Sequence, residues 1–335
     1  MTEPVEPDQA PGASHPRATF EFYGHEAQEQ ALAEALAGGR MHHAWLFGGP
    51  KGLGKATLAY RFARRLLGAK QNGARPLDVS ADDPVARRIA ANAHPDIFVL
   101  RRTMGDRGRY RREIIVDDAR ALGEFFSLMP AEGGWRVAIV DAADELNSNA
   151  ANAILKTLEE PPPRSALMLV CHAPGATLAT IRSRCRRLNM RPLDDALVGK
   201  AVERATGVNP DAAVLYLAAG RPGRAIALQA SGVGDIAATV QRGMQDAPFK
   251  GISSLLPLAF ERGGADRLDL TIDVAQDWLA QQARAGADAG KNEDRLAAAW
   301  FELEDVRQQA QELNLDATHA LARTAHILTR AVQAK

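Results

Sequence analysis

The chain has 335 residues, and its 41 lysines and arginines balance 41 aspartates and glutamates. A molecule with zero formal charge has no overall field that attracts nucleic acid, so any contact with DNA must come from local patches or from partner proteins. Its two cysteines exclude a disulfide framework and a four-cysteine zinc site, and the lack of a long apolar run or a secretion signal predicts a cytoplasmic protein without membrane contact.

The first part of the chain predicts a tail, a helix and a strand. Residues 1–19 are rich in Pro, Glu and Ala and have few apolar side chains to bury, which predicts a disordered tail. Apolar residues at helical spacing then predict an amphipathic helix that ends at Gly38-Gly39. The apolar residues 43–47 predict a buried strand.

A glycine-rich loop follows this strand. Residues 49–57 read Gly-Pro-Lys-Gly-Leu-Gly-Lys-Ala-Thr and fit the phosphate-loop pattern G-x-x-x-x-G-K-[ST] at every position but the last. Gly49, Gly52 and Gly54 allow the backbone to direct its N–H groups at phosphate oxygens, and Lys55 reaches the outer phosphates. The next helix points the positive end of its dipole at the same anion. The loop therefore predicts a site for ATP or ADP.

The one departure from the pattern is Ala56, which occupies the position of the hydroxyl that normally holds Mg²⁺. Thr57 is the next residue, but one step along a helix rotates a side chain by roughly 100°. We therefore expect weak or absent Mg²⁺ coordination.

The segment after the phosphate-loop helix alternates between polar stretches and short predicted elements. Residues 69–93 are polar and mixed, which predicts an insertion with a short helix, and residues 97–100 predict a strand. Six arginines lie within 101–112. Such a run is either a loop that contacts phosphate groups or the solvated tip of a hairpin. Asp117 is expected to cap a helix that runs through Met129.

A second motif joins a strand to a carboxylate. Residues 135–140 form a mostly apolar run that ends at Asp141. This is the Walker B pattern, whose carboxylate holds the Mg²⁺ hydration shell. Hydrolysing proteins usually carry Glu at the next position, where this chain has Ala142. Together with Ala56, this residue predicts little or no ATP hydrolysis.

Two further motifs follow. Residues 150–160 predict a helix that Pro161-Pro162-Pro163 stops, and residues 165–171 predict a buried strand. Residues 178–188 then contain four arginines, one of them in the sequence Ser183-Arg184-Cys185.

Together these motifs resemble the bacterial clamp-loader branch of the AAA+ ATPases. The resemblance rests on residues 152–162 and 183–185, with His42-His43-Ala44 and His94-Pro95-Asp96 in addition. It implies an α/β fold with a P-loop AAA+ parallel-sheet domain over 20–190. A small helical lid over 191–231 and an all-α collar domain for oligomerisation over 232–335 would follow.

The resemblance also implies roles for two arginines. Arg184 would be a catalytic arginine finger in trans, which stabilises charge at the nucleotide of a neighbouring subunit and is worth roughly 10³–10⁵ in rate. The alternative is the basic face of an exposed strand, because Arg182, Arg184 and Arg186 alternate. Arg224 matches the sensor 2 arginine of the lid, which touches a phosphate bound in the same chain. Its alternative role is at a helix start after a glycine turn.

The implied partners are the motor (gamma/tau) and delta subunits of the DNA polymerase III clamp loader, in a ring of five. Through this complex the protein would contact the sliding clamp and primed DNA, as a rigid subunit of the replication machinery that does not act as a motor. Many relatives carry a four-cysteine zinc module after the phosphate-loop helix. Residues 68–93 contain no cysteine, so zinc is not expected.

The C-terminal part predicts helices with broad apolar stripes, which could serve both as core and as collar interface. The first stripe comprises Leu268, Ile272, Ala275 and Leu279, widened by Leu270, Val274 and Trp278. The second comprises Leu296, Trp300, Leu303, Val306, Ala310 and Leu313.

Two other functions stay open from the sequence. A self-sufficient ATP-hydrolysing motor would need Thr57 as metal ligand and Asp144 or Glu145 to polarise water. A nucleic-acid-binding module would centre on residues 101–112.

Overall fold

The structure is a computed structural model that describes residues 6–39, 41–105, 110–175, 177–230, 264–288, 294–313 and 317–333. The chain divides into two compact units, residues 1–209 with 219–227 and residues 210–218 with 228–335. The predicted lid over 191–231 is thus shared between the units, and the three-domain boundaries stay a prediction. Residues 231–263, which hold the last residue of the predicted lid and the first part of the predicted collar, lie outside the described residues.

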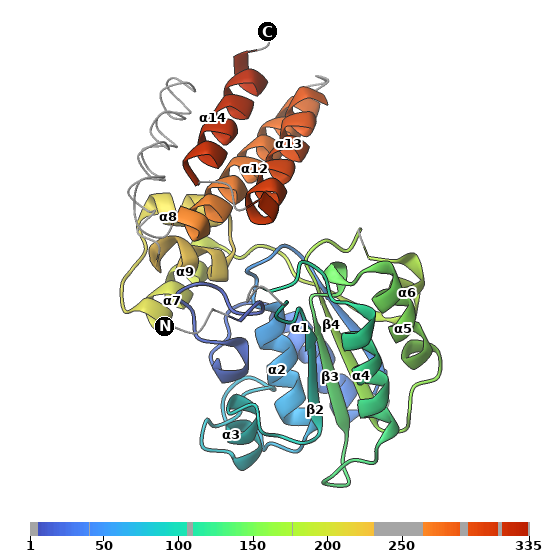
Figure 1. The fold of residues 1–335 in the computed structure, drawn as a ribbon. Coiled ribbons are helices and arrows are strands. Elements are labelled where there is room, and N and C mark those ends of the chain that lie inside the picture. Colours follow the sequence, from blue (N-terminus) through green and yellow to red (C-terminus); the bar gives the residue numbers. More distant parts are fainter. Residues whose placement is uncertain are drawn as a thin grey trace. The chain divides into compact units, whose positions relative to one another are not determined.

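A parallel sheet forms the centre of the first unit (Figure 1). Its strands are β1 (Ala44–Gly48), β2 (Ile97–Arg101), β3 (Arg136–Asp141), β4 (Ser165–Cys171) and β5 (Arg186–Asn189). They lie in the order β2-β3-β4-β1-β5, and each pairs in parallel with its neighbours. Parallel strands need helical crossovers and covered faces. The three inner strands β1, β3 and β4 are accordingly buried along their whole length, whereas the edge strand β5 is largely exposed. The predicted α/β fold is confirmed.

Helices cover both faces of this sheet (Figure 1). One face carries α1 (Glu26–Ala37), α2 (Lys55–Leu66) and α3 (Pro84–Ala90), and the other carries α4 (Val116–Ser127), α5 (Ser148–Glu159) and α6 (Ala179–Arg184). Successive strand side chains point to opposite faces. Trp45 and Phe47 therefore pack with the α1–α3 side, while Leu46 packs with the α4–α6 side.

Two helix starts can be compared with the sequence-based expectation. The predicted cap at Asp117 is wrong, because α4 begins at Val116 and Asp117 lies in its first turn. There its carboxylate faces the positive end of the helix dipole. The short helix expected within residues 69–93 is α3, whose Asp83 accepts hydrogen bonds from the backbone N–H groups of Val85 and Ala86.

Residues 6–19 do not form the disordered tail that the sequence predicts. The Asp8 side chain is fully buried, with Oδ1 2.6 Å from Nη1 of Arg101 and 3.1 Å from Nε2 of His15. Glu6 pairs with Arg17 and Arg101. The short helix η1 (Pro16–Ala18) follows. Composition counts charges but not the partners that a distant strand supplies, so it could not reveal this docked segment.

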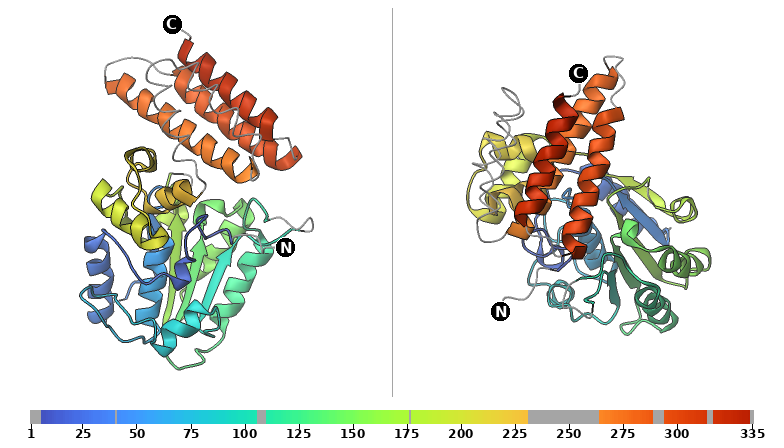
Figure 2. Two further views of the ribbon diagram at one scale, coloured as in Figure 1. Left: turned by 90° about the vertical axis from the view of Figure 1, so that its left-hand side faces the viewer. Right: turned by 45° about the horizontal axis from the view of Figure 1, so that its top comes forward.

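The remaining helices are α7 (Asp195–Thr206), α8 (Ala212–Ala218), α9 (Pro222–Ala230), α12 (Gly264–Asp288), α13 (Asp294–Leu313) and α14 (Ala317–Gln333). In the second unit α12, α13 and α14 lie side by side (Figure 2). Most residues of the predicted stripes are buried in their shared core, while Trp278, Trp300 and Ala310 are only partly buried against it. The side chains of Leu270 and Leu313 lie outside what the structure describes. No described helix combines the length and apolar character that crossing a bilayer requires.

Candidate functional site

The phosphate loop connects β1 to α2 at the carboxyl edge of the sheet. Gly49, Gly52 and Gly54 have φ angles of +145°, +91° and +83°, a region that side-chain-bearing residues rarely adopt. A Cβ atom on Gly49 would also lie 2.4 Å from the backbone oxygen of Met190. The loop conformation therefore requires glycine, as the phosphate-loop pattern predicts.

Lys55 is the first residue of α2, and its side chain is buried. Its Nζ donates hydrogen bonds to the carbonyl oxygens of Gly49 at 2.6 Å and Pro50 at 2.7 Å. Burial lowers the pKa of Lys55 to about 8, although the nearby Asp141 opposes the shift. The carbonyl oxygens of the phosphate loop hold the ammonium group. A bound phosphate would have to compete with these two oxygens for the Lys55 ammonium.

The part of the site that would hold Mg²⁺ offers few ligand atoms. Ala56 presents a methyl group, and Thr57, the residue after it, is buried. Asp141 ends β3 directly opposite Arg101 of β2. Burial, with the carboxylates of Asp8 and Glu145 in addition, raises the pKa of Asp141 to about 7. A metal ligand must be deprotonated, and Ala56 offers no ligand atom, so these residues form a poor site for Mg²⁺.

Both carboxylates that could replace the missing Glu already have partners. Asp144 accepts hydrogen bonds from the backbone N–H groups of His172 at 2.8 Å and Ala173 at 3.0 Å. Glu145 lies 2.7 Å from Nε of Arg102. Burial raises the pKa of Glu145, so ionisation of this carboxyl group is disfavoured. Both carboxylates are therefore engaged in contacts within the chain, Asp144 with the backbone after β4 and Glu145 with Arg102.

Arg224 lies beside the phosphate loop, as the sensor 2 hypothesis requires. The N–H of Gly223 donates to the carbonyl oxygen of Gly52 at 2.8 Å. A Cβ atom on Gly52 would lie 3.0 Å from the backbone nitrogen of Arg224. The start of α9 therefore touches the loop directly, and the buried Arg224 joins Lys55 at this edge of the sheet. Its contact with a phosphate stays a prediction.

Arg184 lies at the opposite, amino edge of the sheet. It ends α6, two residues before β5, and β5 begins beside Trp45 near the start of β1. Since the phosphate loop follows the other end of β1, about 13 Å of strand separates the two places. The alternative of an exposed strand with alternating arginines is wrong for Arg182 and Arg184, which lie in a helix.

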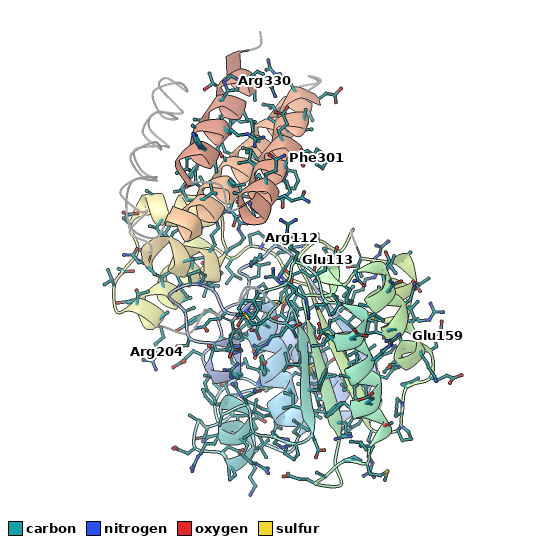
Figure 3. All side chains as sticks on the ribbon, in the orientation of Figure 1. Arg112, Glu113, Glu159, Arg204, Phe301 and Arg330 are labelled. Carbon is teal, nitrogen blue, oxygen red and sulfur yellow. The ribbon has the colours of Figure 1, made fainter. Side chains whose placement is uncertain are left out.

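The Arg184 side chain is at the surface, 35 % exposed. Its Nη2 lies 2.8 Å from Oε1 of Glu159, and its Nη1 donates to the carbonyl oxygen of Thr180 at 3.0 Å. Figure 3 shows Glu159 on the outside of the first unit. The guanidinium is neither enclosed nor completely unpaired.

Three contacts near the two candidate sites were not predicted from the sequence. They are Asp8 beside Arg101, Asp144 on the backbone after β4, and Glu159 beside Arg184. Asp8 is 93 residues from its partner Arg101, and no local pattern connects the two. Glu159 lies within residues 152–162, which carry the family resemblance, and nothing else in the sequence marks it.

A family model described as "DNA polymerase III, delta subunit" matches residues 24–194. The chain is similar to the DNA polymerase III subunit delta' of Pseudomonas aeruginosa, with 34% identity over 75% of this chain and 74% of the relative. The subunit delta' of Yersinia pestis is 32% identical over 77% of this chain and 76% of its own. The DNA polymerase III subunit tau of Escherichia coli is 31% identical over 53% of this chain, which is 26% of that protein.

Proposed function

The chain belongs to the DNA polymerase III delta subunit family, and we propose that it is a delta'-type subunit of the bacterial clamp loader. In this proposal it gives Arg184 to the nucleotide site of a neighbouring motor subunit and hydrolyses little or no ATP itself. Its partners are gamma/tau and delta subunits in a ring of five, which together place the sliding clamp on primed DNA.

The position of Arg184 carries the proposal. A guanidinium that stabilises phosphoryl transfer must contact the transferred group, and Arg184 lies a strand length from the phosphate loop of its own chain. Any nucleotide that it serves must therefore belong to another chain. Its 35 % exposure leaves it accessible to such a partner.

The chain's own site supports a binding role without hydrolysis. The N–H groups of the glycine loop, with Lys55 and Arg224, would hold the phosphates of ATP or ADP, and the nucleotide would supply anionic oxygens to these donors. Ala56 offers no metal ligand, and Asp144 and Glu145 already have partners. The same features argue against the self-sufficient motor. The hypothesis of a nucleic-acid-binding module centred on residues 101–112 stays a prediction, because Arg107 and Arg109 lie outside the described residues.

The test is reconstitution with delta and with motor subunits whose own finger arginines are replaced by Ala, so that Arg184 is the one remaining finger. We expect Arg184→Ala to lower clamp-stimulated ATP hydrolysis by roughly 10³-fold or more at the served site. The control is Arg204→Ala, which removes an exposed arginine paired with Glu21. An unchanged rate in an intact Arg184→Ala complex contradicts the proposal.

The isolated chain provides the second arm of this test. It should show no steady ATP turnover. Turnover that Lys55→Ala abolishes would favour the motor alternative instead.

A further inference from the structure

The ion pair of Arg184 joins two short helices that share one core. Glu159 is the last residue of α5, and Arg184 is the last residue of α6. Ile154 and Leu158 of α5 pack in the same buried cluster as Ile181 of α6. This shared core packs the backbones of both helix ends against one another beneath the two charged side chains.

The carboxylate of Glu159 does not serve its own helix. The carboxyl end of a helix carries partial negative charge, so a glutamate in the last turn is unfavourable by a small amount. The Pro161-Pro162-Pro163 stop ends α5 at this point. Glu159 thus lies at a site where helix stability does not favour it, with its Oε1 2.8 Å from Nη2 of Arg184.

The contacts of Arg184 leave most of its donors available. Of the five N–H groups of a guanidinium, one on Nη2 faces Glu159 and one on Nη1 donates to Thr180. The other three have no partner among the described residues. A phosphate group can accept from these donors while the contacts to Glu159 and Thr180 persist.

We propose that Glu159 is a positioning residue for Arg184, an inference that rests on the proposed function. Its carboxylate restricts the rotamers of a long, flexible side chain before the neighbouring subunit arrives. An arginine that is already oriented loses less side-chain entropy when it contacts the phosphoryl group. Exposed ion pairs of this kind correspond to an effect of at most about fivefold.

The test uses the reconstituted complex in which Arg184 is the one remaining finger. We expect Glu159→Gln to lower kcat at the served site about three- to fivefold, with an unchanged KM for ATP. The matched control is Glu160→Gln, which changes the adjacent exposed carboxylate, one without an ion pair among the described residues. It should leave kcat unchanged.

A double-mutant cycle separates positioning from a general structural effect. In an Arg184→Lys background, whose ammonium lacks the planar fork, Glu159→Gln should change kcat less than twofold. An effect of full size in that background overturns the inference. A raised kcat in the single variant also overturns it, because Glu159 would then mask the arginine.

Two failures can be told apart. If Arg184→Ala has no effect, the proposed function itself fails. If Arg184→Ala abolishes hydrolysis but Glu159→Gln behaves like Glu160→Gln, the proposed function stands and the positioning role is refuted.

Discussion

Glu29 is at the centre of a buried charge network that supports the phosphate loop. It is fully buried, and its Oε1 accepts hydrogen bonds from Nε and Nη2 of Arg61 at 2.9 and 2.8 Å. Its Oε2 accepts from Arg75, which also donates to the carbonyl oxygen of Phe22 at 2.7 Å. The Phe22 ring lies against Gly54, where an added Cβ would be 3.0 Å from Cε2. The network therefore fixes the segment on which the loop rests.

Glu29→Gln removes the charge that compensates two guanidinium groups. Breaking a buried ion pair costs about 3–5 kcal/mol, because the remaining charge is left uncompensated in the interior. Arg61 keeps Asp78 at 2.6 Å, so we expect the lower value, about 3 kcal/mol. At about 2–4 °C per kcal/mol for a unit of this size, the melting temperature of the first unit should fall by about 6–12 °C.

The measurement must report the first unit alone. In a background with Trp278→Phe and Trp300→Phe, fluorescence comes from Trp45 and Trp135, which pack in the first unit. Urea and thermal unfolding can then be followed for Glu29→Gln. The matched control is Glu21→Gln, whose pair with Arg204 is 2.5 Å long but largely exposed, and which should cost at most about 1 kcal/mol. Equal, small losses in both variants would refute the assignment of the network as a structural support.

Two further predictions concern the nucleotide edge. Because the pKa of Asp141 is raised to about 7, the folded state binds a proton that the unfolded state has released, and its stability falls as pH rises from about 4 to about 7. Asp141→Asn should therefore stabilise the first unit at pH 8, by at most about 4 kcal/mol, and change little at pH 4; equal effects at both pH values in urea unfolding would contradict this. Ala56→Thr should restore the missing hydroxyl and raise nucleotide affinity in Mg²⁺ but not in EDTA, as measured by calorimetry; an affinity gain independent of Mg²⁺ would show that the metal ligand is not what the native loop lacks.

The central sheet and the phosphate loop could be predicted because their signals are local. Residues 49–55 carry their backbone requirements in their glycines. An apolar strand that ends in Asp is common, and only its place downstream of the phosphate loop made Asp141 a Walker B candidate. Arg224 lies next to the loop, and only the resemblance indicates this neighbourhood, because the sequence alone does not contain it.

The parts that could not be predicted depend on pairs of residues far apart in the chain. Nothing near Asp8 indicates that Arg101 will meet it. The role of Asp144 depends on the backbone after β4, 28 residues away, and a sequence pattern reports side chains rather than the N–H groups that they reach. The pKa of Asp141 depends on burial and on Asp8, so it became visible only with the fold.

The docked segment before residue 20 determines where the chain can be shortened for expression. The family match begins at residue 24, and a fragment cut there would look complete by homology. It would nevertheless strip Arg64, 1 % exposed, of the carbonyl oxygens of Arg17 and Thr19, which its guanidinium contacts at 2.6 and 3.0 Å. Arg101 would lose both of its carboxylates at the same cut. Any shortened protein used for binding assays should keep residue 6 onward, so that no interior guanidinium is orphaned by the cloning boundary.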